Sequence, residues 1–234
     1  KRGFKLKGTG PISLHLGMDF ERERDDAGRM VLCASPKKCI GKLLDNYEQL
    51  FGEKPKRAKT TRSPLVEGDH PETDESGFLD EEGIKVCQSL IGSLQWVVSV
   101  GRFGIHAAIM TLSGFRAAPR EGHLGRAKRI CSHLSRMRSA KIRIRVEEPD
   151  VADVPSYSHE WMNSIHGDAR EEIPRDAPKP LGRFFTLARC AGANLMHCML
   201  AGRSATGIIH MMNQTPINWC SKKQSTVETA TCGS

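Results

Sequence analysis

The sequence of 234 residues has little of several features that define common protein classes. Aromatic residues make up 6% of it and hydrophobic residues 38%, so few large side chains are present to anchor a core. No apolar run approaches the roughly 20 residues of a membrane-spanning helix, and no charged-then-apolar leader stands at the N-terminus. We therefore expect an intracellular protein that does not enter a membrane.

The eight cysteines also lack any pattern of a metal site or a disulfide framework. No two of them form a CxxC pair, and His197-Cys198 is the only adjacent pair of candidate ligands, without a matching second half. This pattern predicts no metal site. Because no secretory signal is visible, we interpret the cysteines as reduced thiols in or near the core.

Charge is what the sequence has in abundance, and it is unevenly placed. Residues 116–145 hold ten Lys or Arg and a single acid, Glu121. Residues 67–82 hold eight acids and no Lys or Arg, and four more acids lie in residues 147–153. A basic block of this kind suits a surface that faces phosphate, although a charge run is more often a solvated helix face.

The N-terminal part predicts a β-hairpin followed by a helix. Residues 12–20 alternate as a half-buried strand does, residues 25–28 form a turn, and residues 30–33 return as the partner strand. Ser35-Pro36 then opens a helix to about residue 51, with Ser35 as its cap. The apolar stripe of this helix is Ile40, Leu43, Leu44, Tyr47 and Leu50.

Three more helices are expected after a charged surface linker, at about residues 80–100, 105–115 and 120–138. The inward positions of the first are Ile84, Cys87, Leu90, Ile91, Leu94, Val97 and Val98. Those of the last are Leu124, Ala127, Ile130, Cys131, Leu134 and Met137, with Arg126, Arg129 and Arg136 outside.

A basic strand and a second sheet complete the expected elements. The strand at residues 141–146 turns Ile142, Ile144 and Val146 inward and Lys141, Arg143 and Arg145 outward, as an edge or surface strand with a basic face. A connection anchored by Trp161 follows. The second sheet is expected from strands at residues 184–190, 205–212 and 216–220.

Five short motifs, in this order and spacing, make nearly the whole chain resemble the Pol polyprotein of copia-type LTR retrotransposons. They are residues 4–17 ending in His15-Leu16-Gly17, Gln88-Ser-Leu-Ile-Gly-Ser-Leu-Gln-Trp96, Gly101-Arg-Phe-Gly-Ile105, Pro119 with His123 and Ala127-Lys-Arg129, and Thr215-Pro-Ile-Asn-Trp219 with Ser221-Lys-Lys-Gln224. The resemblance implies the C-terminal part of a reverse transcriptase that runs into a truncated ribonuclease H domain.

The implied fold class is α+β: a β-hairpin, a small helical thumb-like bundle, and then a partial mixed sheet of a ribonuclease H-like fold. The implied domains are the end of the palm with the first thumb helix (1–52), a charged linker (53–79), the thumb and connection (80–148), a connector (149–182) and the truncated sheet (183–234). The first residue is not Met, and the helix expected to begin near Val227 is cut off after about two turns at Ser234. We therefore expect a fragment.

The resemblance also implies which catalytic groups the fragment lacks. Both reactions of the parent enzyme use two divalent metals, Mg²⁺ or Mn²⁺, held by carboxylates. The polymerase aspartates belong before Lys1, and Gly192 and Asn194 stand at the first two acidic positions of the ribonuclease. Glu228 comes too early to be the helix glutamate, which would follow Ser234. We therefore expect no catalytic residue, no metal ligand and no cofactor in this chain. We interpret the substitutions as decay of an unselected copy, and the alternative is divergence within a working element.

Binding of an RNA–DNA hybrid or a primer–template duplex is the function that the fragment would retain, beside contacts with the remaining parts of the polyprotein. By the same resemblance, its place would be cytoplasmic particles and the nucleus. The predicted nucleic-acid-binding residues are His15, Leu16, Gly17, Arg126, Lys128, Arg129, Arg136, Arg138, Lys141, Arg143 and Arg145. Two alternatives stay open: a non-catalytic nucleic-acid-binding module, and a helical interaction protein whose basic block docks an acidic partner.

Overall fold

The structure, a computed structural model, describes residues 10–56, 62–150, 174–178, 182 and 184–227. In these residues it is an α+β protein with four α-helices and two antiparallel sheets, as the predicted class requires. The chain runs through β1 (Leu14–His15), β2 (Met18–Arg24), β3 (Met30–Ser35), α1 (Lys37–Phe51), η2 (Pro71–Thr73), α2 (Glu81–Ser99), η3 (Phe103–Ile105), α3 (His106–Ser113), α4 (Glu121–Arg136), β4 (Ile142–Ile144), β5 (Leu187–Cys198), β6 (Arg203–Met212) and β7 (Thr215–Lys223).

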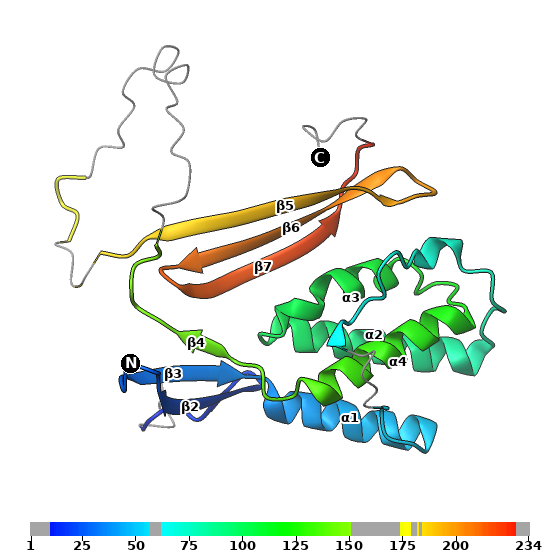
Figure 1. The fold of residues 1–234 in the computed structure, drawn as a ribbon, viewed down its shortest axis with the longest axis horizontal. Helices are drawn as coiled ribbons and strands as arrows, with labels where there is room; N and C mark the ends of the chain where they lie inside the picture. The colour runs from blue at the N-terminus through cyan, green and yellow to red at the C-terminus, as the bar shows by residue number, and fades with distance from the viewer. Residues whose placement is uncertain (1–9, 57–61, 151–173, 179–181, 183, 228–234) are drawn as a thin grey trace, which may run out of the picture.

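The two sheets lie on different sides of the helical bundle (Figure 1). The first has the strand order β1-β2-β3-β4 and continues from the N-terminal end of α1, and the second has the order β5-β6-β7 and lies across α3. The second sheet is antiparallel throughout, so the prediction of a mixed sheet is wrong for the strands that the structure describes. No strand that would need a crossover connection lies among these residues.

The predicted N-terminal hairpin is present, but its first strand is broken in two. Leu16 and Gly17 have φ values of 48° and 88°, and they form a tight turn between paired residues His15 and Met18. Glycine adopts positive φ without steric cost, and two-residue hairpin turns need it. The alternation of residues 12–20 predicts one continuous strand, but the structure has a short additional hairpin there.

The helix α1 is capped differently from the prediction. No side-chain hydrogen bond caps it from Ser35 or Pro36; instead, the buried carboxylate of Asp19 on β2 accepts the backbone N–H of Lys38 at 2.9 Å. The same carboxylate lies 3.0 Å from the ammonium of Lys38. An acid at a helix N-terminus satisfies an otherwise unpaired donor and complements the helix dipole.

One hydrophobic core unites α1, α2, α3 and α4. Its largest fully buried side chains include Ile40, Leu90, Ile91, Leu94, Val97, Ile105, Ile109, Leu112, Ile130 and Leu134, which confirms most predicted inward positions. Because α1 shares this core and β4 pairs with β3, residues 10–52 and 80–148 pack as one unit in the structure.

Three predicted inward side chains are instead exposed: Leu50 at 39%, Met137 at 43% and Val146 at 77%. Each lies at or beyond the end of its element, since α1 stops at Phe51, α4 at Arg136 and β4 at Ile144. At these ends the apolar periodicity of the sequence continues, but no neighbouring element is present in the described part of the chain to cover the side chain.

The thiols are only partly placed as predicted. Cys33, Cys87, Cys131 and Cys198 are buried and Cys39 is half-buried, but Cys190 and Cys220 on the second sheet are exposed, and all seven are free. Trp161, Glu228, Cys232, most of the connector and the helix expected after Val227 lie outside the described residues. In the described part of the chain, no helix is both long and apolar enough to cross a membrane.

Candidate nucleic-acid interface

His15, Leu16 and Gly17 form the tip of the β1–β2 hairpin. Leu16 is 71% exposed, so an apolar side chain projects from the tip. A Cβ atom at Gly17 would lie 3.7 Å from both Nε1 of Trp96 and Cγ1 of Val100. The tip is therefore held against the C-terminal end of α2, beside the half-exposed indole of Trp96.

Arg126 does not stand free on the outside of α4, which corrects its predicted placement. Its guanidinium bonds the two carboxylate oxygens of Asp69 at 2.8 and 2.6 Å and also pairs with Asp74. Burial acts to raise the pKa of Asp74, but hydrogen bonds from Ser76 and Arg126 lower that pKa to about 2. The acidic segment expected to be a surface linker thus docks onto the basic helix and neutralises part of it.

The next two basic residues of α4 are also engaged with the bundle. The ammonium of Lys128 lies 3.8 Å from the ring centroid of Phe51, a cation–π contact with the end of α1. Arg129 is half-buried, and its Nε atom is enclosed. The middle of α4 therefore presents little free positive charge.

Exposed basic side chains gather instead at the C-terminal end of α4. Arg136 and Arg138 are both exposed there. The guanidinium of Arg138 lies over Gly41 of α1, where a Cβ atom would be 2.7 Å from its Nη2. A side chain at position 41 would displace the end of the Arg138 side chain.

β4 is an edge strand of the first sheet with a basic face, as predicted. Lys141 and Arg143 are exposed on either side of the buried Ile142. The ammonium of Lys141 pairs with the carboxylate of Glu23 on β2, which raises the pKa of Lys141. Among the described residues, Arg143 makes no ion pair of this kind.

Arg145 follows β4 and joins the two sheets. Its backbone N–H donates to the hydroxyl of Thr215 at 2.8 Å, and that hydroxyl donates to the carbonyl of Arg145 at 2.9 Å. Its guanidinium makes a long contact of 3.4 Å with Oε1 of Gln214. The side chain is thus held near the start of β7 without an acid partner in the described part of the chain.

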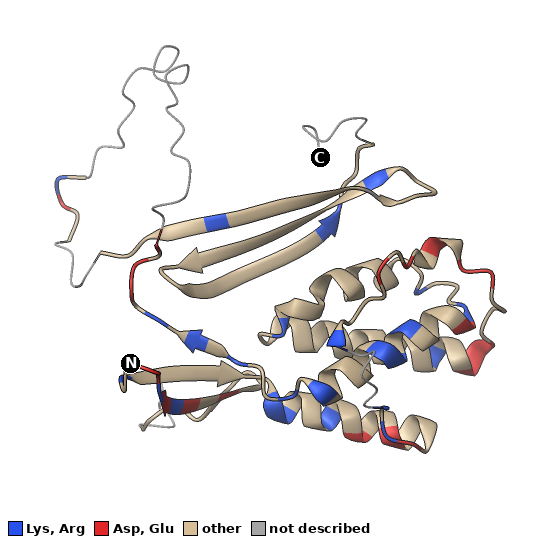
Figure 2. Ribbon diagram, viewed as in Figure 1, with Lys and Arg blue, Asp and Glu red and all other residues tan. Residues whose placement is uncertain are grey.

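The hairpin tip and β4 meet at the turn that follows α2. A Cβ atom at Gly101, whose φ is 107°, would lie 3.4 Å from Cδ1 of Ile142 and 3.5 Å from Cε of Met18. The structure therefore gathers His15–Gly17 with the basic strand, which are more than a hundred residues apart in the chain. Figure 2 shows Lys and Arg along β4 and the chain entering it, with acids on β2 of the same sheet and on the chain that leaves β4.

A cavity of about 630 Å³ opens beside this strand. No acidic residue lines it; its basic lining residues are Arg102, Lys141, Arg143 and Arg145. Arg102 was not among the predicted binding residues, although it lies in the motif Gly101-Arg-Phe-Gly-Ile105. Nothing in the sequence distinguished it from other arginines, because only the fold brings it to β4.

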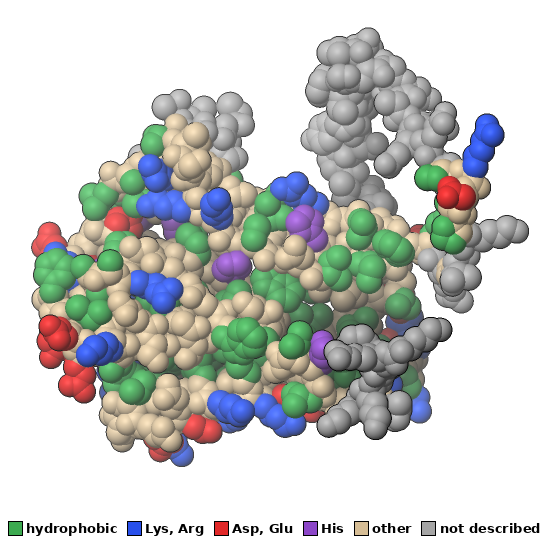
Figure 3. Space-filling view, turned by 180° about the vertical axis from the view of Figure 1, so that it is seen from behind, with side chains coloured by type: hydrophobic (Ala, Val, Ile, Leu, Met, Phe, Trp, Pro, Cys, Tyr) green, Lys and Arg blue, Asp and Glu red, His purple; other side chains and the backbone are tan. Residues whose placement is uncertain are grey.

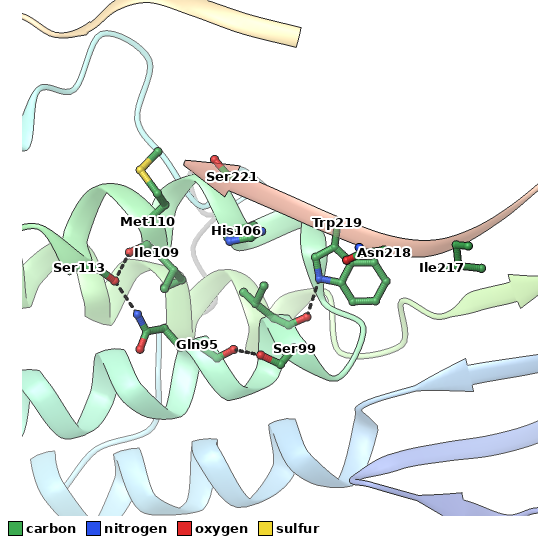
Figure 4. Close-up of a pocket in the computed structure, with 11 residues that line it drawn as sticks. Gln95, Ser99, His106, Ile109, Met110, Ser113, Ile217, Asn218, Trp219 and Ser221 are labelled. Carbon is green, nitrogen blue, oxygen red and sulfur yellow. Dashed lines mark hydrogen bonds between the residues drawn. The ribbon is translucent and has the colours of Figure 1, made fainter. Parts of the chain in front are cut away.

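A second cavity, of about 590 Å³, lies between β7 and the helices α2 and α3 (Figure 4). Hydrogen bonds within the protein satisfy much of its lining: Gln95 donates to Ser113 at 2.8 Å and Ser113 to the carbonyl of Ile109 at 2.7 Å. The indole N–H of Trp219 donates to the carbonyl of Val98 at 3.0 Å. The residues around this cavity therefore hold the second sheet against the helical bundle.

The positions expected to carry ribonuclease ligands lie on β5. Gly192 is exposed, with open space where a side chain would be, and Asn194 is exposed with its amide 3.3 Å from Nδ1 of His197. His197 is further bonded to the hydroxyl of Thr111 at 2.8 Å. Within the described residues, no three His, Cys, Asp or Glu side chains are grouped as a metal ion needs.

The opposite side of the molecule has a different character. In Figure 3, Lys and Arg side chains lie in small groups among hydrophobic and neutral ones rather than in one continuous area.

Comparison with family models, with curated proteins and with solved structures finds no match to this chain.

Proposed function

We propose that this chain is a nucleic-acid-binding part of a copia-type retrotransposon polyprotein, from its reverse transcriptase into its ribonuclease H. Its ligand is the duplex that such an enzyme copies or cleaves, an RNA–DNA hybrid or a primer–template. The observation that carries the proposal is the meeting of the hairpin tip and the basic strand β4 at the end of α2. The sequence predicts the hairpin tip from a motif and β4 from the alternation of its basic and apolar residues.

The chemistry of this surface fits the backbone of a duplex. Arg136, Arg138, Arg143 and Arg145 carry positive charge without a described acid partner, and guanidinium groups recognise phosphate by paired hydrogen bonds. The exposed Leu16 beside Trp96 adds apolar contact area. Phosphate contacts position a protein on nucleic acid without reading its sequence.

Catalysis is not part of the proposed function. With Gly192 and Asn194 in place of the expected acids, β5 offers no carboxylate to a divalent metal at these positions. The remaining parts of the polyprotein would supply the polymerase carboxylates and metal ions.

The test is the salt dependence of duplex binding. A fluorescent RNA–DNA hybrid is titrated with the full chain at several salt concentrations, and the dissociation constant is read from anisotropy. We expect the logarithm of the affinity to fall linearly with the logarithm of the salt concentration, because bound cations release counterions. Absent binding by a chain with a folded circular dichroism spectrum would instead favour a helical interaction protein.

A further inference from the structure

The cavity beside β4 contains an arginine whose hydrogen bonds are incomplete. Nη2 of Arg102 donates to the carbonyl of Met137 at 2.9 Å, which caps the C-terminal end of α4. Nε of the same guanidinium is buried and has no hydrogen-bond partner. A buried donor without an acceptor is costly, so such a group indicates a missing acceptor.

No acid of the described chain serves as that acceptor. The ion pairs of these residues leave Arg102 out, no acid lines the cavity, and the carboxylate of Glu23 on the same sheet is paired with Lys141. Burial lowers the pKa of Arg102, which shows that the guanidinium is partly removed from water without a compensating anion. A charge in this state gains most from an anionic ligand.

The other lining residues are suited to an oxyanion. Arg143 and Arg145 approach the cavity from β4, and Ser139 and Gln214 add neutral polar groups from the loop before β4 and the turn before β7. Gly104 faces the cavity with open space where a side chain would be. The site is thus assembled from three separate parts of the chain and carries an excess of positive charge.

We infer that this cavity binds a single phosphate group of a nucleic-acid strand, with Arg102 as its central donor and Arg143 and Arg145 as supporting cations. The inference deepens the proposed function and rests on it for the origin of the phosphate. It gives Arg102 a specific role in binding. A basic surface that attracts nucleic acid through dispersed charges would not need this residue. Planar guanidinium groups bind phosphate through two parallel N–H donors, and the edge of Arg102 that carries Nε also carries Nη2, which donates one of its two hydrogens to Met137.

The direct test observes the Nε–Hε resonance of Arg102 by nitrogen-15 NMR in the full-length wild-type chain. Inorganic phosphate is the probe, and chloride holds the ionic strength constant. We expect a saturable shift of this resonance with phosphate and none with chloride. An unmoved Arg102 resonance, while the protein stays folded, overturns the inference without requiring any variant.

Matched variants then test which arginine matters. We expect Arg102→Gln to weaken phosphate binding about tenfold or more, since a charge-assisted donor is lost. Arg102→Lys keeps the charge but not the planar fork, so its affinity should lie in between. Arg22→Gln is the control, because Arg22 is exposed on β2, does not line the cavity, and its replacement removes an equal charge. Equal weakening by Arg22→Gln and Arg102→Gln would contradict a discrete site.

A duplex arm separates failure of this inference from failure of the proposed function. Phosphate binding at Arg102 without affinity for an RNA–DNA hybrid supports the cavity and refutes nucleic acid as its source. Salt-dependent hybrid binding that Arg102→Gln leaves unchanged, together with no phosphate shift, supports the duplex surface and refutes the cavity.

Discussion

The guanidinium of Arg126 on α4 and the carboxylate of Asp69, 57 residues earlier, form a two-pronged ion pair with its shorter bond at 2.6 Å. The most acidic and the most basic segments of the chain are therefore partly partners of each other. Asp74 joins the pair from the same acidic segment. The excess charge of the basic block is smaller than the sequence indicates, and it is displaced toward β4.

Acid should weaken the contact between these segments. The pKa of Asp74 is about 2 in the folded chain and near its ordinary value of 3.8 when unfolded, so the group stabilises the fold above that ordinary value. This contribution, on the order of 1–2 kcal/mol, should be lost as the pH falls from about 5 through 2. The measurement is the free energy of unfolding in urea against pH, for the wild type and Asp74→Asn.

The variant should start less stable at neutral pH and lose less stability on acidification. Asp26→Asn serves as the control, since Asp26 is an exposed turn residue. Parallel pH profiles for the wild type and Asp74→Asn would show that the pair with Arg126 contributes nothing to stability.

Local pattern was enough to predict most of the helical bundle. The apolar positions Leu90, Ile91, Leu94 and Val97 recur at helical spacing, and burial follows from that spacing alone. Asp80 caps α2 by accepting the N–H of Gly83 at 2.8 Å, in the place where the predicted helix was expected to begin. Signals of this kind span only a few residues and do not depend on contacts between distant segments.

The candidate site could be predicted only in part, because it depends on contacts between distant segments. Arg143 and Arg145 were selected on strand alternation, which the edge position of β4 preserves. The neutralisation of Arg126 and the recruitment of Arg102 each depend on a partner more than 30 residues away. Spacing within one element carries no information about such partners.

Trp219 should contribute strongly to the stability of the packing between the second sheet and the helices. Its indole donates to Val98 at 3.0 Å, and its ring centroid lies 5.2 Å from that of Phe103. We expect Trp219→Ala to cost about 2–4 kcal/mol of unfolding free energy, and Trp219→Phe about 1 kcal/mol for the lost hydrogen bond. Trp96→Phe, at a 54% exposed site, is the control in the same urea titration.

Thiol labelling should distinguish the two classes of cysteine. Cys190 and Cys220 are exposed, whereas Cys87 and Cys131 are buried, and burial raises the pKa of Cys131 to about 12. The thiolate is the reactive form, so the exposed pair should react with a maleimide within minutes in the native state. Peptide mapping by mass spectrometry identifies the labelled sites. Labelling of Cys131 as fast as Cys190 would contradict the described core.

Added Mg²⁺ or Mn²⁺ should not lead to cleavage of an RNA–DNA hybrid by the pure chain. Gly192 occupies the first expected acidic position, and a glycine offers no ligand to a divalent metal. The assay follows a labelled RNA strand on a denaturing gel, with a commercial ribonuclease H as the positive control. Reproducible metal-dependent cleavage would sink the interpretation of Gly192.

Removing the positive charges of Arg143 and Arg145, on and after β4, should weaken duplex binding and lower its salt dependence. Arg143→Ala/Arg145→Ala is expected to weaken RNA–DNA hybrid binding uniformly across sequences and to reduce the salt slope by up to about two, one for each lost phosphate contact. The fold should persist, because Arg143 is exposed and Arg145 binds Thr215 through its backbone. Anisotropy titrations at several salt concentrations give the slope.

The matched control removes the same charge from elsewhere. Arg22→Ala/Lys85→Ala lowers the net charge by two at exposed residues of β2 and α2 that do not line the cavity beside β4. If binding depended only on net charge, both double variants would lose affinity equally, since long-range attraction does not distinguish positions on the surface. If β4 contacts the backbone, only Arg143→Ala/Arg145→Ala changes the slope, because counterion release counts phosphates that are touched. An unchanged slope in that variant would remove β4 from the contact surface and leave the hairpin tip and the end of α4 as the remaining candidates.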